Sequence, residues 1–230
     1  MQGATQSAVL IFRHRKKRVK HTTYNKKTVQ DLRQRIKEQR RALSLAEVNA
    51  LSQQVYAQVA KHPFLQTPRT IASYLSCAGE IATTEINSFL GSLGHHLCLP
   101  VIDPEIKGQM EFYRYNEGDT LYPNRYAILE PAVTPQSHVA PDLLEVVLVP
   151  LVAFNTKGDR VGMGGGYYDR LLKKISISCI TIGLAYDFQM VPNLSCQQWD
   201  MPLDEIITPT QHYICNSKYS ALAPTSSTSR

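Results

Sequence analysis

The sequence lacks both a framework of paired cysteines and a long apolar run. Its five cysteines are odd in number and scattered, with no C-x-x-C spacing, which argues against disulfides and against a zinc site of that kind. The longest apolar stretch, residues 143–154, is interrupted by Glu145 and is too short to cross a bilayer. The order of a signal peptide is also missing, because the apolar residues 8–12 precede the basic run. These absences predict a cytoplasmic protein with free thiols.

Positive charge is concentrated at one end of the chain. The formal net charge is +6, but residues 1–41 carry +11 and the remaining 189 residues carry −5. Residues 1–27 show no helical or strand period and contain a basic run at 13–18, which is typical of a disordered tail. An RNA-binding segment, a targeting segment or a start codon assigned too far upstream would look the same. A nucleic-acid-binding protein is therefore one alternative, although the acidic body argues against more than nonspecific contacts of the tail.

From residue 28 onward, helical and strand patterns alternate. Apolar spacing predicts a helix over 28–43, and Ser44-Leu-Ala-Glu47 is a capping box that opens a second helix. Strands are predicted at 70–76, 95–102, 110–115, 145–154 and 178–186, and helices at 84–93 and 167–174. This order predicts a single three-layer α/β/α domain with a mostly parallel sheet and a helical N-terminus, over residues 28–213. Residues 214–230, rich in Ser, Thr, Ala and Pro, are expected to be a disordered tail.

The strongest functional signal is the stretch Gly158–Arg170. Four glycines fall within residues 162–166, between a buried strand and a helix start, so backbone N–H groups and the helix dipole would favour an anion there. Arg160 and Arg170 flank the glycines, and Asp169 is an oxygen ligand suited to Mg²⁺. The stretch lacks both a Gly-Lys-Ser/Thr ending and the G-x-G-x-x-G pattern. A tight strand-to-helix connection is the plainer interpretation, but this concentration of residue types favours function.

The string Arg160-Val-Gly-Met-Gly-Gly-Gly-Tyr-Tyr-Asp-Arg170 closely resembles the signature of the 5-formyltetrahydrofolate cyclo-ligase family, also called 5,10-methenyltetrahydrofolate synthetases. Segments around 79–83, 122–131 and 199–208 resemble further family motifs in family order, so the resemblance spans residues 28–213. It implies an enzyme that uses Mg²⁺ and ATP to convert 5-formyltetrahydrofolate into 5,10-methenyltetrahydrofolate, releasing ADP and phosphate. Phosphoryl transfer to the formyl oxygen would precede attack by N10. This route needs no covalent nucleophile, in agreement with the absence of a Ser-His or Cys-His signature. A monomer is expected.

The resemblance also implies roles for particular residues. Catalysis would involve Arg160, Tyr167 and Asp169, and Mg²⁺ would be held by Asp169 and Asp200. The nucleotide site would consist of Arg33, Arg160, Val161, Gly162, Met163, Gly164, Gly165, Gly166, Tyr167 and Tyr168. The folate site would consist of Leu75, Glu80, Tyr126, Met163, Gly164, Gly165, Gly166 and Tyr167.

The basic residues of the first helix have a plainer alternative. Arg33 and Arg40 could simply belong to its solvent-exposed face, together with Lys37 and Arg41. The family commonly has a Lys or Arg four residues before Arg33, where this chain has Val29, so Lys26 or Lys27 would have to substitute.

Other assignments have alternatives too. Glu80 could be an exposed carboxylate near a helix start, where the dipole favours it. Tyr167 and Tyr168 could be core aromatics, and Arg170 could be structural. The pair His95–His96 suggests a metal, but adjacent strand residues point to opposite faces. A non-catalytic folate-binding descendant is a further alternative, which the intact Arg160, Asp169 and Asp200 argue against.

Overall fold

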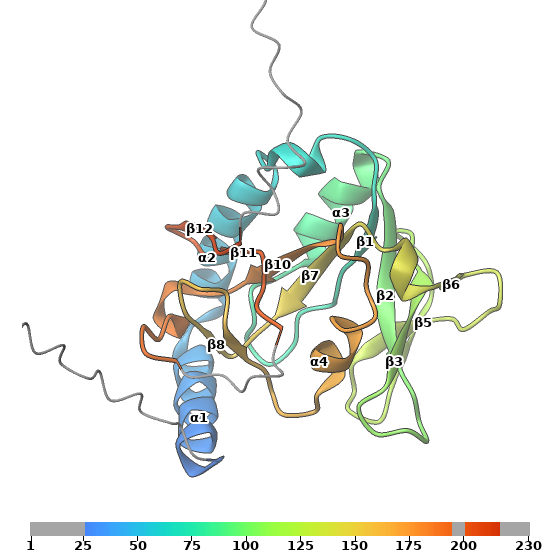
Figure 1. Ribbon diagram of the computed structural model, residues 1–230. Helices are drawn as coiled ribbons and strands as arrows, with labels where there is room; N and C mark the ends of the chain where they lie inside the picture. The colour runs from blue at the N-terminus through green and yellow to red at the C-terminus, as the bar shows by residue number, and fades with distance from the viewer. Residues whose placement is uncertain (1–25, 195–200, 217–230) are drawn as a thin grey trace, which may run out of the picture.

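The computed structural model describes residues 26–194 and 201–216 (Figure 1). Most of the two predicted tails lies outside these ranges, as does Asp200. The first helix begins at Lys26, two residues inside the segment expected to be a tail, and the last strand ends at Ile214. Within the described ranges, no helix has the length and apolar character needed to span a membrane.

Four α-helices and three short 3-10 helices are formed by the described residues. The α-helices are α1 (Lys26–Ala42), α2 (Leu45–Val59), α3 (Thr84–Ser92) and α4 (Tyr167–Leu171). The 3-10 helices are η1 (Pro63–Leu65), η2 (Pro141–Leu143) and η3 (Asp187–Gln189). The predicted capping box is confirmed at the start of α2, where the Ser44 side chain accepts from the Glu47 N–H and the Glu47 carboxylate accepts from the Ser44 N–H.

Eight strands form the main sheet in the order β12-β11-β10-β7-β1-β2-β3-β6. The five strands from β11 to β2 are parallel, and β12, β3 and β6 pair antiparallel at the two edges. This confirms the mostly parallel sheet. The strands are β1 (Thr70–Ala72), β2 (His96–Ile102), β3 (Met110–Arg114), β6 (His138–Val139), β7 (Val146–Pro150), β10 (Ile180–Leu184), β11 (Glu205–Ile207) and β12 (His212–Ile214).

Two small hairpins accompany the sheet. One pairs β4 (Leu121–Pro123) with β5 (Leu129–Pro131), and the other pairs β8 (Ala153–Phe154) with β9 (Arg160–Val161). Leu32 and Ile36 of α1 pack against Val161 and the neighbouring apolar residues of the second hairpin. This contact fixes the first helix beside the segment that leads into the glycine stretch.

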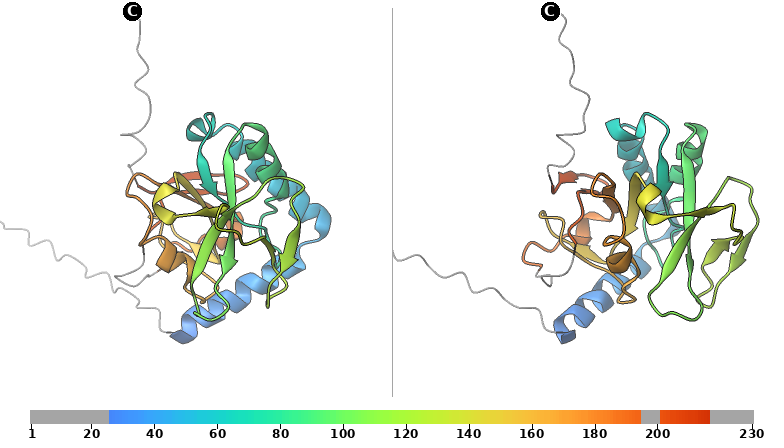
Figure 2. Two further views of the ribbon diagram at one scale, coloured as in Figure 1. Left: turned by 90° about the vertical axis from the view of Figure 1, so that its right-hand side faces the viewer. Right: turned by 45° about the vertical axis from the view of Figure 1, so that its right-hand side comes forward.

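The core has two sides because residues of β7 alternate between the faces of the sheet. Val146 and Leu148 pack with Val55 of α2 and with α3, whereas Val147 and Val149 pack with Leu171 of α4. All four β7 residues are fully buried, and burial of such a side chain contributes about 1.5–3 kcal/mol. Helices thus cover both faces, as Figure 2 shows, and the predicted three-layer α/β/α arrangement is confirmed.

Two predicted strands are shorter in the structure than in the sequence pattern. The stretch 145–154 breaks after Pro150, because the Leu151 carbonyl accepts from Gln189 and Arg40 side chains instead of a neighbouring strand. The stretch 70–76 leaves the sheet after β1, and the carbonyl of Tyr74 accepts from the Thr83 hydroxyl. Both strands therefore end where carbonyl groups bond side chains instead of the backbone of a neighbouring strand. These ends are the carboxyl ends of parallel strands, where α/β proteins bind ligands.

Candidate functional site

The glycine stretch forms a loop between β9 and α4 whose conformation favours glycine at two positions. Gly164 and Gly166 have φ values of +98° and +73°, in the left-handed region. A Cβ at Gly166 would lie 2.6 Å from Arg170 Nη1, and Arg170 itself donates to the carbonyls of Gly165 and Gly108, at 3.3 Å each. Arg170 therefore braces the loop, which is the structural role considered for it. Helix α4 is only five residues long, shorter than predicted.

Arg160 and Asp169 are brought together across this loop. The Arg160 Nη2 atom lies 2.6 Å from Asp169 Oδ1, and Nη1 donates to the Met201 carbonyl at 2.7 Å. The Arg160 side chain is 3% exposed, whereas that of Asp169 is 48% exposed. The carboxylate is thus held from its protein side and open to solvent elsewhere. Asp200, the second predicted Mg²⁺ ligand, lies outside the described residues, directly before Met201 in the sequence.

Arg33 reaches the same loop from α1. Its Nε donates to the Gly162 carbonyl at 2.8 Å, and a Cβ at Gly164 would lie 3.4 Å from its guanidinium carbon. The solvent-exposed alternative is therefore wrong for Arg33. It is wrong for Arg40 as well, which is 4% exposed and donates through Nη2 to the Leu151 carbonyl at 2.6 Å.

Arg40 lies beside Glu80 in the candidate site, a position that the sequence analysis did not predict. Its Nη1 lies 3.6 Å from Glu80 Oε1, and Glu80 is only 9% exposed, so the exposed alternative for Glu80 is also wrong. Burial raises the pKa of the Glu80 carboxyl, while Arg40 and the hydrogen bond from the Cys77 N–H oppose that rise. The available signal was the seven-residue spacing from Arg33, which is about two helical turns and places both arginines on one face of α1.

Three tyrosines surround Glu80. Tyr74 is buried, and its hydroxyl has no hydrogen-bond partner among the residues that the structure describes. Burial, followed by the nearby Glu80 and Tyr168, raises the Tyr74 pKa well above its usual value. Burial and Glu80 likewise raise the pKa of Tyr168, and the Tyr186 hydroxyl donates to the Glu80 carbonyl at 3.1 Å. Tyr168 therefore connects the glycine loop to this group of residues, Glu80 with Arg40, Tyr74, Tyr168 and Tyr186, which we call the Glu80 cluster.

Tyr167 points elsewhere and is linked to the β4–β5 hairpin. A Cβ at Gly165 would lie 2.6 Å from the Tyr167 ring. A hydrogen bond with Tyr167 raises the pKa of Arg125, whose guanidinium carbon also lies 5.2 Å from the centre of the Tyr126 ring. Tyr126 is 57% exposed, so its predicted folate contact would come from the hairpin surface. Arg125 had no signal in the sequence.

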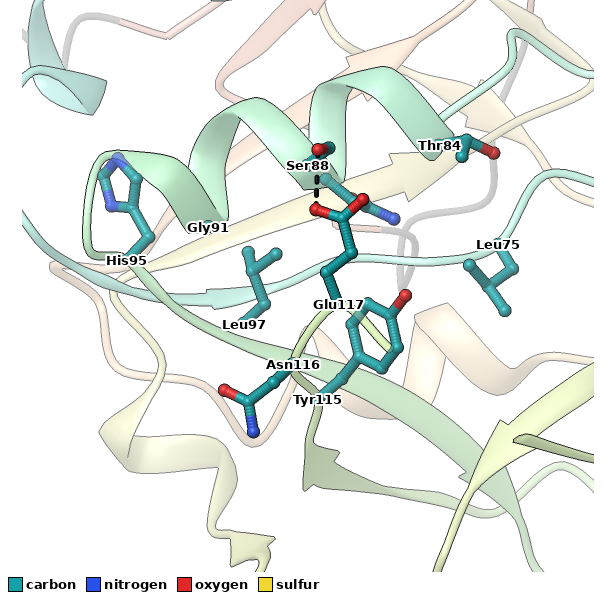
Figure 3. Close-up of a pocket in the computed structure, with 10 residues that line it drawn as sticks. Leu75, Thr84, Ser88, Gly91, His95, Leu97, Tyr115, Asn116 and Glu117 are labelled. Atoms are coloured by element: carbon teal, nitrogen blue, oxygen red, sulfur yellow. Dashed lines mark hydrogen bonds between the residues drawn. The ribbon is translucent and has the colours of Figure 1, made fainter. Parts of the chain in front are cut away.

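Two cavities adjoin these residues without containing the Arg160–Asp169 pair. One, of about 230 Å³, lies between α3 and β2 and has Leu75 at one end (Figure 3). Tyr115 faces into it, and the Ser88 hydroxyl donates to Glu117 at 2.7 Å on its wall. The other, of about 250 Å³, is lined by Gln109, Met110, Tyr167, Arg170, Leu171, Lys173 and Lys174. Each shares one residue with the predicted folate site.

Comparison with known proteins decides the family. The model of the 5-formyltetrahydrofolate cyclo-ligase family matches residues 25–209. This chain belongs to that family. The 5-formyltetrahydrofolate cyclo-ligase of Escherichia coli is 34% identical over 177 residues, which cover 76% of this chain and 97% of the relative. The Haemophilus influenzae cyclo-ligase is 39% identical over 140 residues, which cover 60% and 75%.

Solved structures of the family share the fold. The 5,10-methenyltetrahydrofolate synthetase of Aquifex aeolicus matches with a TM-score of 0.71 at 29% identity, over 81% of this chain and 92% of that one. The synthetase of Mycoplasma pneumoniae gives 0.63 at 27% identity, over 79% and 98%. The family resemblance read from the glycine stretch is therefore confirmed.

The adjacent histidines behave as the strand pattern predicted. His95 is buried, where its ring nitrogens bond the Arg69 N–H and the Leu65 carbonyl at 3.0 Å each, and His96 is exposed. The two side chains do not share a site.

Proposed function

We propose that this protein catalyses the ATP- and Mg²⁺-dependent cyclisation of 5-formyltetrahydrofolate to 5,10-methenyltetrahydrofolate, with release of ADP and phosphate. The observation that carries the proposal is the convergence of Arg33, Arg160 and Asp169 on the glycine loop of a cyclo-ligase family member. Arg33 comes from α1 and the other two from the glycine stretch, so two cations and a carboxylate meet beside the backbone N–H groups of the loop.

The reaction requires activation of a poor leaving group. In the proposed sequence, the formyl oxygen attacks the γ-phosphorus and ADP departs, which leaves an iminium phosphate. N10 then attacks the iminium carbon and loses its proton, and the bond from carbon to the phosphate oxygen breaks. Because no side chain becomes covalently modified, the protein contributes position and charge.

The glycine loop would hold the phosphates. Gly164 and Gly166 keep the backbone free of Cβ atoms, and the guanidinium of Arg33 lies beside Gly164. Arg160 is buried and already bonded to Asp169 and Met201, so its positive charge acts from beneath the loop and fixes Asp169. A buried cation that is fixed in advance stabilises developing negative charge without reorganisation.

Asp169 fits the expected Mg²⁺. Arg160 bonds one oxygen of a carboxylate whose side chain is 48% exposed, so ligand space remains, and carboxylates are the protein groups this ion prefers. Mg²⁺ would neutralise charge on the transferring phosphoryl group. Asp200 is the second proposed ligand.

The Glu80 cluster would bind the folate ring. A buried carboxylate that is 3.6 Å from Arg40, beyond hydrogen-bond distance, can accept from N–H donors of a pterin. The Tyr74 and Tyr168 hydroxyls lie beside it and would order the ring next to the loop.

Purified protein with 5-formyltetrahydrofolate and Mg-ATP should form the methenyl product, which is followed by its absorbance. Omission of ATP, or chelation of Mg²⁺, should stop the reaction. Absence of product from folded protein that binds both substrates would contradict the proposal.

A further inference from the structure

A second polar cluster lies outside the candidate site, where the chain leaving α2 meets β11 and the edge strand β12 (Figure 1). It consists of His62, Glu205 and His212. His62 Nε2 and His212 Nε2 lie 2.8 Å and 2.6 Å from the same carboxylate oxygen, Glu205 Oε2. The ligand atoms of all three residues fall within 4.8 Å of one another. The ring centres of the two histidines are 5.6 Å apart, and both Nε2 atoms contact the same Glu205 oxygen.

The carboxylate at the centre of the cluster is completely buried. Glu205 is 0% exposed, and its other oxygen, Oε1, has no hydrogen-bond partner among the described residues. A buried carboxylate with one oxygen unsatisfied is costly unless a cation compensates it.

We propose that His62, Glu205 and His212 bind a Zn²⁺ ion. Two imidazole nitrogens and one carboxylate oxygen are a donor set that zinc uses, whereas Mg²⁺ and Ca²⁺ favour oxygen alone. His62 and Glu205 are buried and His212 has a side chain 31% exposed, so the fourth position would open to water beside His212.

The geometry requires only a small adjustment. Ligand atoms around a tetrahedral zinc ion lie about 3.3 Å apart, so the two contacts to Glu205 must lengthen by roughly half an ångström. His212 can lengthen its own contact because it lies on the short edge strand β12, which pairs with one neighbour only, and the His62 contact would lengthen by a shift of the Glu205 or His62 side chain. The ion would join the chain that follows α2 to the β11–β12 hairpin, two regions that are more than a hundred residues apart in sequence.

The competing possibility is that protons alone satisfy the cluster. Two neutral imidazoles, each donating Nε2–H to Glu205, would give the observed contacts without a metal. The two cases differ in whether one equivalent of a divalent transition metal binds at these residues.

Titration of chelator-treated, full-length protein with Co²⁺, in excess Mg²⁺, tests the assignment. We expect one equivalent to bind with the visible absorption of a low-coordinate cobalt site and without a thiolate charge-transfer band. His212→Ala removes the exposed ligand and should weaken binding at least ~100-fold. Glu205→Gln, which keeps the side-chain shape, should do the same. Zn²⁺ should raise the Tm of the native protein by a few degrees and leave that of His212→Ala unchanged.

His138→Ala is the matched control, because His138 forms an exposed pair with Glu111 at 3.4 Å. It should bind Co²⁺ and respond to Zn²⁺ as the native protein does. Absence of saturable binding at one equivalent would show that protons satisfy the cluster. Undiminished binding in His212→Ala, or a thiolate band, would place the metal elsewhere. Each of these results would overturn the proposal.

Discussion

The two arginine–carboxylate pairs of the candidate site differ in which partner meets solvent. Arg160 is buried and holds Asp169 at 2.6 Å, while the Asp169 side chain is 48% exposed. Arg40 and Glu80 are both buried, and their nearest charged atoms are 3.6 Å apart. Arg40 instead donates at 2.6 Å to the Leu151 carbonyl, so its positive charge is near Glu80 but not bonded to it.

This difference assigns the two carboxylates to different tasks. Asp169 is fixed on one side and open on the other, which suits an acid that shares a cation with its substrate. Glu80 is buried without a short ion pair, and its pKa is raised because burial disfavours the charged carboxylate. Such an arrangement favours a ligand that supplies the missing hydrogen bonds, and the following predictions test the contrast.

The largest effect is expected at Asp169. Asp169→Asn keeps the side-chain volume but removes the charge proposed to hold Mg²⁺, and turnover should fall by about 10²–10³-fold. The fold should remain intact, because the side chain is half exposed. Steady-state rates over a Mg²⁺ series and far-UV circular dichroism measure both. The exposed Asp142→Asn is the control and should retain native turnover. If Asp169→Asn unfolds the protein, the carboxylate is structural.

Glu80→Gln should separate binding from stability. Loss of a hydrogen bond from a substrate N–H to a charged acceptor costs about 1.5–3 kcal/mol, so KM for 5-formyltetrahydrofolate should rise by about 10–100-fold. Thermal stability at neutral pH should not fall, because the neutral amide avoids burial of a carboxylate. Glu85→Gln, an exposed acid in the first turn of α3, should leave both quantities unchanged. An unchanged KM in Glu80→Gln would remove Glu80 from the folate site.

The pH dependence of Glu80→Gln has a defined sign. Because folding raises the Glu80 pKa above its usual value of 4.5, the stability contributed by this group is fully present below that value. It is lost as pH rises through the folded pKa. The native protein should therefore lose stability relative to Glu80→Gln as pH increases above 4.5, measured by urea unfolding. The opposite trend would show that Arg40 dominates over burial.

A smaller effect is expected from substitutions in the glycine loop, which leads into α4 and Asp169. Gly164 has φ +98° and faces the Arg33 guanidinium, whereas a Cβ at Gly162 would meet nothing within 4 Å. Gly164→Ala should cost about 1–2 kcal/mol in the free energy of unfolding, and Gly162→Ala close to none. Urea unfolding of both variants measures the difference. Equal stability in the two would contradict the described loop conformation.

The smallest effect is expected at a pair outside the site. Arg69 and Glu145 lie 2.9 Å apart with side chains 29% and 42% exposed. Glu145→Gln should reduce stability by less than about 1 kcal/mol and leave turnover unchanged. Burial would raise the Glu145 pKa, but hydrogen bonds from Arg69 and Thr70 lower it. Its contribution should therefore be present above pH 4.5 and disappear as pH falls, and loss of turnover would contradict this assignment.

Much of the fold followed from local sequence signals. The capping box at Ser44 placed the start of α2, and apolar periodicity located α1, α3, β2 and β3. The hairpins β4–β5 and β8–β9 were missed because strands of two or three residues are too short to show a period. The break after Pro150 was missed because it depends on side chains of Gln189 and Arg40 that come from elsewhere in the chain.

The candidate site likewise contains residues that the sequence predicted and residues that it missed. The glycine stretch and Arg160, Asp169 and Glu80 were predicted as site residues because they lie in compact family motifs. Arg40 was assigned to the solvent-exposed face of its helix because an arginine on a basic helix normally faces water. Its burial depends on a carbonyl 111 residues away. Cluster residue His62 likewise lies 143 residues from Glu205, so no local sequence pattern connects it with Glu205 and His212.

Transfer of phosphate to the substrate is the central claim, and an isotope measurement tests it most directly. With ¹⁸O in the formyl group of 5-formyltetrahydrofolate, the oxygen should leave bonded to phosphorus. Mass spectrometry should find one labelled atom in each inorganic phosphate released and none in water. Arg160→Ala should slow the transfer without changing where the label appears, because it weakens charge stabilisation and the hold on Asp169 but does not alter which bonds form and break. Label in bulk water, or methenyl product formed at full rate without ATP, would contradict the account.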